Sequence, residues 1–165
     1  MLKFSLDNDL EPDVDKMWDL LCDADYMRRY HLEGLGFQDF AVEQEDWRGE
    51  VLHRVIKVVP RLDMPGPLKK LFGETMSYRE HAHFDRSTKV WRWHTDMPGP
   101  GKKIQIGGSI EILPGRGDWG CSRRTHFEVE AKILGIGGMI EKTIKKESID
   151  NYERAARFIN ANPEG

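Results

Sequence analysis

Apolar and polar residues alternate most clearly between positions 102 and 114. Every second residue from Ile104 to Ile112 is isoleucine or glycine, and the residues between them are polar or glycine. Because successive side chains of a strand point to opposite faces, this pattern predicts a strand with one buried face and one solvated face. Weaker patterns of the same kind complete a set of seven predicted strands, over residues 2–10, 36–46, 49–60, 74–84, 87–97, 102–114 and 117–132.

Short turn sequences separate several of these strands. Residues 46–49, 85–87 and 114–118 contain the glycine, proline, aspartate and serine that favour tight turns. Strands joined by such turns pair with their neighbours along the chain, so we expect an antiparallel sheet.

Two short helices are predicted between the first and second strands. The first begins near Pro12 and Asp13, because proline and acidic residues suit the first turn of a helix. A second helix over residues 23–32 ends before Gly34 and Gly36. Spacings of three and four residues give the first helix an apolar face, made of Val14, Met17, Trp18, Leu21 and Cys22.

A long helix is predicted at the end of the chain, after the glycines at 135–138. It follows a run of strands, so its apolar stripe must pack against their sheet. This geometry predicts an internal cavity enclosed by the sheet and the helix. The stripe is interrupted at Lys145–Ser148, which we interpret as a polar patch that faces inward. Its apolar members are Ile136, Met139, Ile140, Ile144, Tyr152, Ala155, Ala156 and Ile159.

Two segments share a motif: residues 63–70 and 96–103 both begin Asp-Met-Pro-Gly-Pro and end Lys-Lys. Because proline interrupts strands, we expect both to be loops. In a meander they lie at the same end of the sheet as residues 135–138, and we expect the three to form the mouth of a cavity. Lysines gather there, as a solvated surface or as a site for an anionic head group or membrane: Lys69, Lys70, Lys102, Lys103, Lys142, Lys145 and Lys146.

Three stretches carry a resemblance to a known superfamily: Gly107-Gly108, Pro114-Gly115-Arg116-Gly117, and Ala131-Lys132-Ile133-Leu134-Gly135-Ile136-Gly137-Gly138-Met139-Ile140-Glu141. With the order of elements, they resemble an uncharacterised bacterial family within the START-like (SRPBCC) superfamily. That superfamily includes the birch pollen allergen, lipid-transfer START domains and polyketide cyclases.

The resemblance covers essentially the whole chain and implies an α+β helix-grip fold. In that fold a curved antiparallel seven-stranded sheet wraps around a long C-terminal helix, in the order β-α-α-β-β-β-β-β-β-α. It implies a single START-like ligand-binding domain over residues 1–165, with an apolar cavity between sheet and helix.

Composition narrows the possible functions. The 165 residues, 39% hydrophobic and 32% charged, fit one globular domain. A net charge of -3 and a pI of about 6.1 imply no general attraction to nucleic acid. We expect neither a membrane span nor a secretory signal, because long apolar runs are absent. Cys22 and Cys121 match no metal or redox spacing, so we expect free thiols and a cytoplasmic protein.

Inward-facing residues are the candidate ligand-binding residues. Trp91 and Trp93 share a strand face, which fits either a cavity wall or an ordinary core. Arg54, Glu80 and Arg123 have apolar neighbours of the same parity, so one of them could orient a polar head group or act as a catalytic acid, unless it lies at an edge. The candidate set is Tyr78, Glu80, Trp91, Trp93, Ile106, Ile110, Arg123, Phe127, Met139, Ile140, Ile144 and Ser148.

His81 and His83 point to the same side of one predicted strand, as metal ligands do. A third ligand at a predictable spacing is missing, and parity places Tyr78, Ala82 and Phe84 inside. We therefore interpret both histidines as facing solvent and expect no metal and no cofactor. The chain also contains no glycine-rich phosphate loop and no nucleophile elbow.

These patterns favour a carrier or sensor that binds a hydrophobic small molecule or lipid in its internal cavity, rather than an enzyme. One alternative is a cyclase- or hydratase-type enzyme with Glu80 or Tyr78 as its acid or base. Another is a protein-interaction module, which a large exposed apolar patch would favour. A peripheral membrane contact, and either a monomer or a homodimer, are compatible with the sequence.

Overall fold

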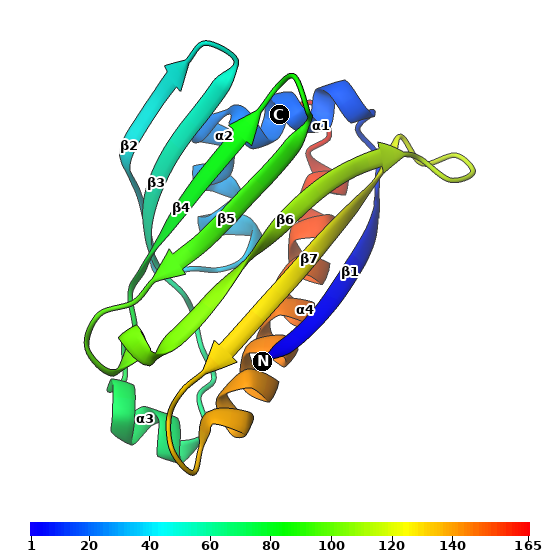
Figure 1. Cartoon of the computed structure of the whole chain (residues 1–165). Coiled ribbons are helices and arrows are strands. Elements are labelled where there is room, and N and C mark those ends of the chain that lie inside the picture. The colour runs from blue at the N-terminus through cyan, green and yellow to red at the C-terminus, as the bar shows by residue number, and fades with distance from the viewer.

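The computed structural model describes residues 1–165 and contains one antiparallel sheet of seven strands, in the order β1-β7-β6-β5-β4-β3-β2 (Figure 1). Strands β2 to β7 form a meander, and only β1 pairs out of chain order, with the last strand. The strands are β1 (Leu2–Leu10), β2 (Asp39–Arg48), β3 (Val51–Val59), β4 (Tyr78–Asp85), β5 (Val90–Asp96), β6 (Ile104–Pro114) and β7 (Cys121–Ala131).

The long helix α4 crosses one face of the curved sheet and packs against β1 and β7 (Figure 1). The helical elements are α1 (Val14–Cys22), α2 (Ala24–Arg29), the π-helical turn η1 (Tyr30–Gly34), α3 (Gly66–Phe72), the 3-10 turn η2 (Gly99–Lys103) and α4 (Gly137–Ala161). None of them is both long enough and apolar enough to cross a membrane. The predicted α+β helix-grip fold is confirmed, with its two N-terminal helices, curved sheet and long C-terminal helix.

The main core lies between the sheet, the N-terminal helices and the second half of α4. Met17 and Leu21 on α1 belong to the same buried cluster as Ala155 and Ile159 on α4. The Asp13 carboxylate accepts a hydrogen bond from a first-turn backbone N–H, so α1 begins where the sequence predicted. This core therefore lies at the end of the fold that contains α1, α2 and the second half of α4. The space beside the first half of α4 is lined by other side chains.

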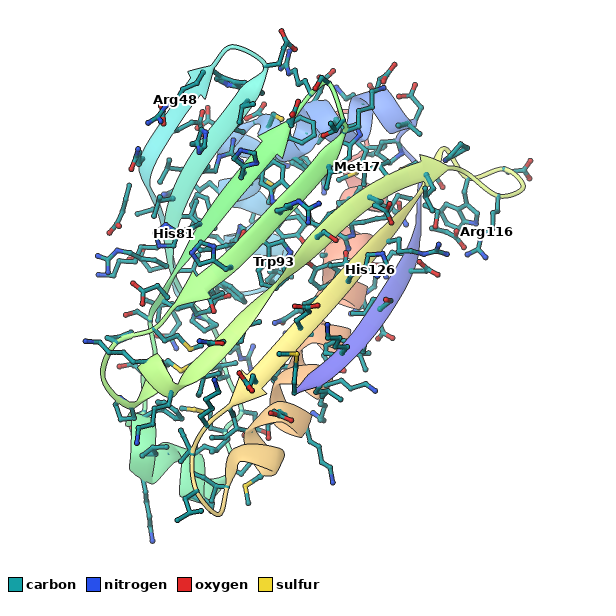
Figure 2. All side chains as sticks on the ribbon, viewed as in Figure 1. Met17, Arg48, His81, Trp93, Arg116 and His126 are labelled. Carbon is teal, nitrogen blue, oxygen red and sulfur yellow. The ribbon has the colours of Figure 1, made fainter.

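The inner and outer faces of the sheet follow the predicted parity. Ile104, Ile110 and Ile112 are buried, and Ala82 and Phe84 point inward from β4. On the outer face His81 stacks on His94, and His53 meets His83 edge to face. Figure 2 shows His81 and His126 on the face of the sheet turned away from α4.

The two segments with the shared motif are helical, so the prediction of plain loops is wrong. Gly66–Phe72 forms α3 and Gly99–Lys103 forms η2, each with proline in its first turn. Proline breaks strands, but it suits the first turn of a helix because its missing N–H would be unpaired there anyway. Both segments lie, as predicted, at the end of the sheet from which β7 leads into α4 (Figure 1).

Candidate functional site

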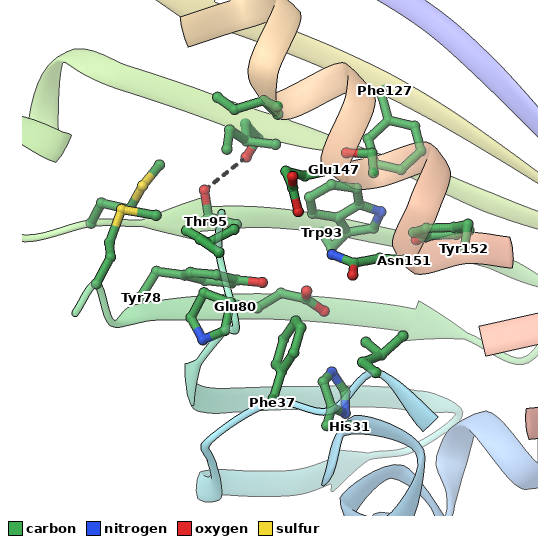
Figure 3. A pocket seen from close by; sticks show the side chains of 18 of the residues that line it. His31, Phe37, Tyr78, Glu80, Trp93, Thr95, Phe127, Glu147, Asn151 and Tyr152 are labelled. Carbon is green, nitrogen blue, oxygen red and sulfur yellow. Dashed lines mark hydrogen bonds between the residues drawn. The ribbon is translucent and has the colours of Figure 1, made fainter. Parts of the chain in front are cut away.

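A cavity of about 200 Å³ lies between the inner face of the sheet, α4, η1 and the segment around α3 (Figure 3). Of its 31 lining residues, 21 are hydrophobic, which makes it an apolar site with a small number of polar groups. Strands β4, β5, β6 and β7 provide one wall and the first half of α4 provides the opposite wall.

Most residues of the predicted site lie around this cavity. Met139 does not, and its predicted place is wrong, because its side chain is 41% exposed at the start of α4. Successive residues of a helix point about 100° apart, so Ile140 turns inward and Met139 turns to solvent. The lining residues from the predicted set are Tyr78, Glu80, Trp91, Trp93, Ile106, Ile110, Arg123, Phe127, Ile140, Ile144 and Ser148.

Aromatic rings form much of the wall. Trp93 and Phe127 meet edge to face with ring centroids 5.4 Å apart, and Phe127 meets Tyr152 in the same way at 5.2 Å. Trp91 is buried in the main core and borders the cavity, and Trp93 lines the cavity and packs against the same core, so both alternatives left open by the sequence apply. The Trp93 indole N–H is buried without a hydrogen-bond partner.

Glu80 is the most unusual polar residue of the cavity. Its carboxylate points from β4 into the space enclosed by Tyr78, Trp93 and Asn151 (Figure 3). No hydrogen bond or ion pair holds it, and burial raises its pKa from 4.5 to about 7, although the positive charge of Arg54 opposes this. Near neutral pH this group can therefore gain or lose a proton.

Arg54 has a structural role, unlike Glu80. It is 3% exposed and does not line the cavity. Its guanidinium donates to the carbonyl oxygens of Leu21, at 2.7 Å, and Cys22, at the end of α1. Its Nε pairs with Glu45 at 2.7 Å. These contacts join the last turn of α1 to the sheet and use the donors that a ligand would need.

Arg123 borders the cavity but is almost sealed by neutral groups. It is 1% exposed and donates to the Tyr30 hydroxyl at 3.3 Å and to Asn8 Oδ1 at 3.0 Å. Its guanidinium lies over the Tyr152 ring, 4.5 Å from the centroid. It forms no ion pair with a carboxylate, and its Nε has no partner.

Several lining residues were missing from the predicted set. Glu147 belongs to the polar patch predicted on α4, and Asn151 and Tyr152 follow Ser148 at helical spacing, so the sequence contained a signal for them. His31 had no such signal. It reaches the wall because the π-helical turn η1 places it there. Its Nδ1 donates to the Met27 carbonyl at 2.7 Å, and burial lowers its pKa to about 4.

The end of the sheet predicted as the mouth is filled by a second apolar cluster. Its buried members come from the two motif segments and from the elements that follow: Met64, Leu68 and Met97, with Ile104 at the start of β6 and Ile140 near the start of α4. These side chains also line the cavity, so they form its wall at this end. The lysines of α3 and η2 lie outside them, exposed to solvent.

A second, outer hollow of about 680 Å³ lies where β5 and β6 separate. Their pairing stops at His94 and Gly107, although both strands continue. Beyond that point the Thr95 hydroxyl donates to the Ile106 carbonyl at 3.4 Å, the dashed line in Figure 3. The hollow and the cavity share one wall, made of Trp93, Thr95, Met97, Ile104 and Ile106.

Nowhere does the structure place three or more histidine, cysteine, aspartate or glutamate side chains to hold a metal ion. On the outer face, the ring of His81 packs against His94 and the ring of His83 against His53. Cys22 and Cys121 are both free and lie on different elements.

Similar solved structures share this fold. A START superfamily protein from Mycobacterium smegmatis is 10% identical, with a TM-score of 0.63 over 97% of each chain. Norcoclaurine synthase from Thalictrum flavum is 11% identical, with a TM-score of 0.64 over 96% of this chain and 86% of that chain. The Zhui aromatase/cyclase from Streptomyces sp. R1128 is 11% identical, with a TM-score of 0.59 over 94% of this chain and 90% of that chain.

These likenesses confirm the START-like fold that the sequence resemblance implied, and at such identities they establish the fold alone. No curated protein matches the chain by sequence. Residues 6–161 match the sequence model of a family described as "Protein of unknown function (DUF2505)".

Proposed function

This chain belongs to the DUF2505 family of proteins of unknown function, and we propose that it binds a small, mainly apolar molecule in the cavity between the sheet and α4. The observation that carries the proposal is a cavity with apolar walls and polar groups that have no partner within the protein. Sites for small molecules have this composition, in which apolar walls supply affinity and a few polar groups fix orientation.

The size of the cavity favours a ligand of about one ring system. Its volume is about 200 Å³. An apolar cavity of about 150 Å³ is enough to hold benzene, whereas sites for drug-sized ligands occupy about 300–1,000 Å³. A long-chain lipid would have to displace the cluster around Met64 and Leu68, so we favour the smaller ligand.

Filling the cavity from α4 is expected to abolish binding. In Ser148→Phe the added ring enters a space of about 200 Å³ and takes the place of a ligand. NMR titration with indole, a neutral ring probe, follows the indole N–H signal of Trp93. We expect a saturable shift in the wild type and a loss of at least about tenfold in affinity in the variant.

Lys142→Phe is the matched control, because it adds the same ring to the same helix on an exposed residue outside the cavity. It should bind indole like the wild type. Solvent extraction of the purified proteins, followed by mass spectrometry, tests for a ligand acquired in the cell. Equal indole binding by wild type and Ser148→Phe would place the probe elsewhere and contradict the proposal.

A second candidate function is acid–base catalysis on the bound molecule, and Glu80 is the observation that favours it. A carboxyl group with a pKa of about 7 inside an apolar cavity is suited to proton transfer near neutral pH. Tyr78, two residues before it on β4, adds a hydroxyl to the same cavity. Two of the solved structures that share the fold carry the names of enzymes, a synthase and an aromatase/cyclase.

Comparison of metabolite consumption tests the catalytic alternative. Purified wild type and Glu80→Gln are incubated with a small-molecule extract of the source cells, and mass spectrometry follows compounds that disappear. A catalytic Glu80 predicts a compound consumed by the wild type at least about 100-fold faster, within the range of general acid–base catalysis. Identical consumption by both proteins would exclude this role for Glu80.

A further inference from the structure

The cavity has an excess of negative groups. Glu80, Glu147 and Asp63 line it, and Arg123 is the only lysine or arginine among its lining residues. Arg123 already donates to Tyr30 and Asn8 and is covered by the Tyr152 ring. Both terminal nitrogens of its guanidinium therefore already have partners within the protein.

Glu80 lacks a cation within the protein. Its inward-facing neighbours on the adjacent strands are Ile56 and Thr95, which carry no charge. Arg54, whose positive charge acts on the Glu80 carboxyl group, is bound to Glu45 and to the end of α1. A carboxylate in an apolar cavity without an ion pair loses hydration that nothing in the protein replaces.

The walls around Glu80 suit a cation that carries a ring. Trp93 and Phe37 face the same part of the cavity as the carboxylate, and Tyr152 lies beyond Asn151 (Figure 3). The faces of aromatic rings attract cations, most strongly where water is excluded. A ring on the ligand would pack against the apolar walls, while a charged nitrogen would meet Glu80.

We propose that the ligand of this cavity is a small ring-bearing amine, bound as its ammonium ion against the Glu80 carboxylate. This inference rests on the proposed small-molecule function and specifies its ligand class. A neutral ring compound loses the charge-assisted hydrogen bond, and a ring carboxylate places a second negative charge beside Glu80.

Three probes of nearly equal size separate the ligand classes: benzylamine, benzyl alcohol and benzoate. NMR titration at pH 8 is expected to give an affinity for benzylamine at least about tenfold higher than for benzyl alcohol, and still higher relative to benzoate. In Glu80→Gln the difference between amine and alcohol should fall to within about threefold.

The pH dependence of the wild type gives a readout that does not depend on a variant. Ionised Glu80 is the form that binds an ammonium ion, so the affinity for benzylamine should fall by up to about tenfold for each pH unit below about 7. The affinity for benzyl alcohol should change little over the same range. Other titratable side chains at or near the cavity, besides its tyrosines, are Arg54, His31, Asp63, Arg123 and Glu147.

The outcomes distinguish a failure of the amine proposal from a failure of the proposed small-molecule binding. Equal or tighter binding of benzyl alcohol or benzoate would overturn the amine proposal and leave the cavity as a ligand site. An amine preference that survives in Glu80→Gln would likewise overturn the role of Glu80. Failure of all three probes and of indole to shift the Trp93 signal would contradict the proposed function as well.

Discussion

At pH 8, replacing Glu80 by glutamine is expected to stabilise the protein by up to about 3 kcal/mol. Burial raises the pKa of Glu80 from 4.5 to about 7 in the folded protein. Between these values the folded state binds more protons than the unfolded state, so the free energy of unfolding falls as the pH rises from 4.5 to 7. The pKa difference corresponds to about 3 kcal/mol, and glutamine removes this cost above pH 7.

In the acid range, His31 changes the free energy of unfolding in the direction opposite to Glu80. Burial lowers its pKa from 6.5 to about 4, so the unfolded state takes up a proton first as the pH falls. The contribution of His31 to stability is therefore lost between pH 6.5 and 4, by an amount similar to that of Glu80 and with the opposite sign. Between pH 4.5 and 6.5 the two contributions largely cancel.

Single variants should reveal each contribution. Chemical denaturation from pH 4.5 to 8 is expected to show stability falling towards acid more steeply in Glu80→Gln than in the wild type. In His31→Asn, which keeps a donor near the Met27 carbonyl, the Glu80 slope should remain and stability should rise towards acid. Glu153→Gln, on an exposed part of α4, is the control and should follow the wild type. Parallel curves for all four proteins would contradict both assignments.

Gly108→Ala is expected to lower the free energy of unfolding by about 3 kcal/mol. A Cβ at this position would overlap with the carbonyl oxygen of His126 on β7 and lie 3.3 Å from the Trp93 ring. The obstacle is backbone rather than a flexible side chain, so β6 and β7 would have to separate locally. Glycine in a strand commonly marks such a close approach of another backbone.

Gly138→Ala is the matched control for Gly108→Ala. Gly138 lies near the start of α4, and a Cβ there meets nothing within 4 Å. Alanine should stabilise the protein by about 0.5 kcal/mol, because it reduces the freedom of the unfolded chain. Denaturant titration of both variants is the measurement, and a Gly108→Ala protein as stable as the wild type would mean that the sheet accommodates the added methyl group.

The sequence predicted the fold from residues whose local preferences agree with one another. The alternation from Ile104 to Ile112, the helix start at Pro12 and Asp13 and the long stripe of α4 each indicate one element without reference to the rest. The elements that such signals predict are found in the folded protein, because the signals depend on backbone geometry and on the burial of one face. The paired proline motifs were the exception, since proline excludes a strand but permits either a loop or the start of a helix.

The candidate site was predicted less completely. Parity placed Tyr78, Trp93 and Phe127 on the inner face, where they line the cavity. It also predicted both Arg54 and Glu80 as inward-facing charged residues that could contact a ligand. In the structure Arg54 binds the end of α1 and Glu45, whereas Glu80 has no partner. His31 was missed because its position depends on a single widened helical turn.

The sequence by itself determined the α+β order, the inner and outer faces of the strands, and the polar interruption on α4. The tertiary structure alone decided that a cavity of about 200 Å³ remains, that the cluster around Met64 and Leu68 lies at its predicted mouth, and that Glu80 is left without an ion pair. Periodicity records which way a side chain points. Volume and ion pairing depend on the distance between elements far apart in the chain, and no local pattern encodes that distance.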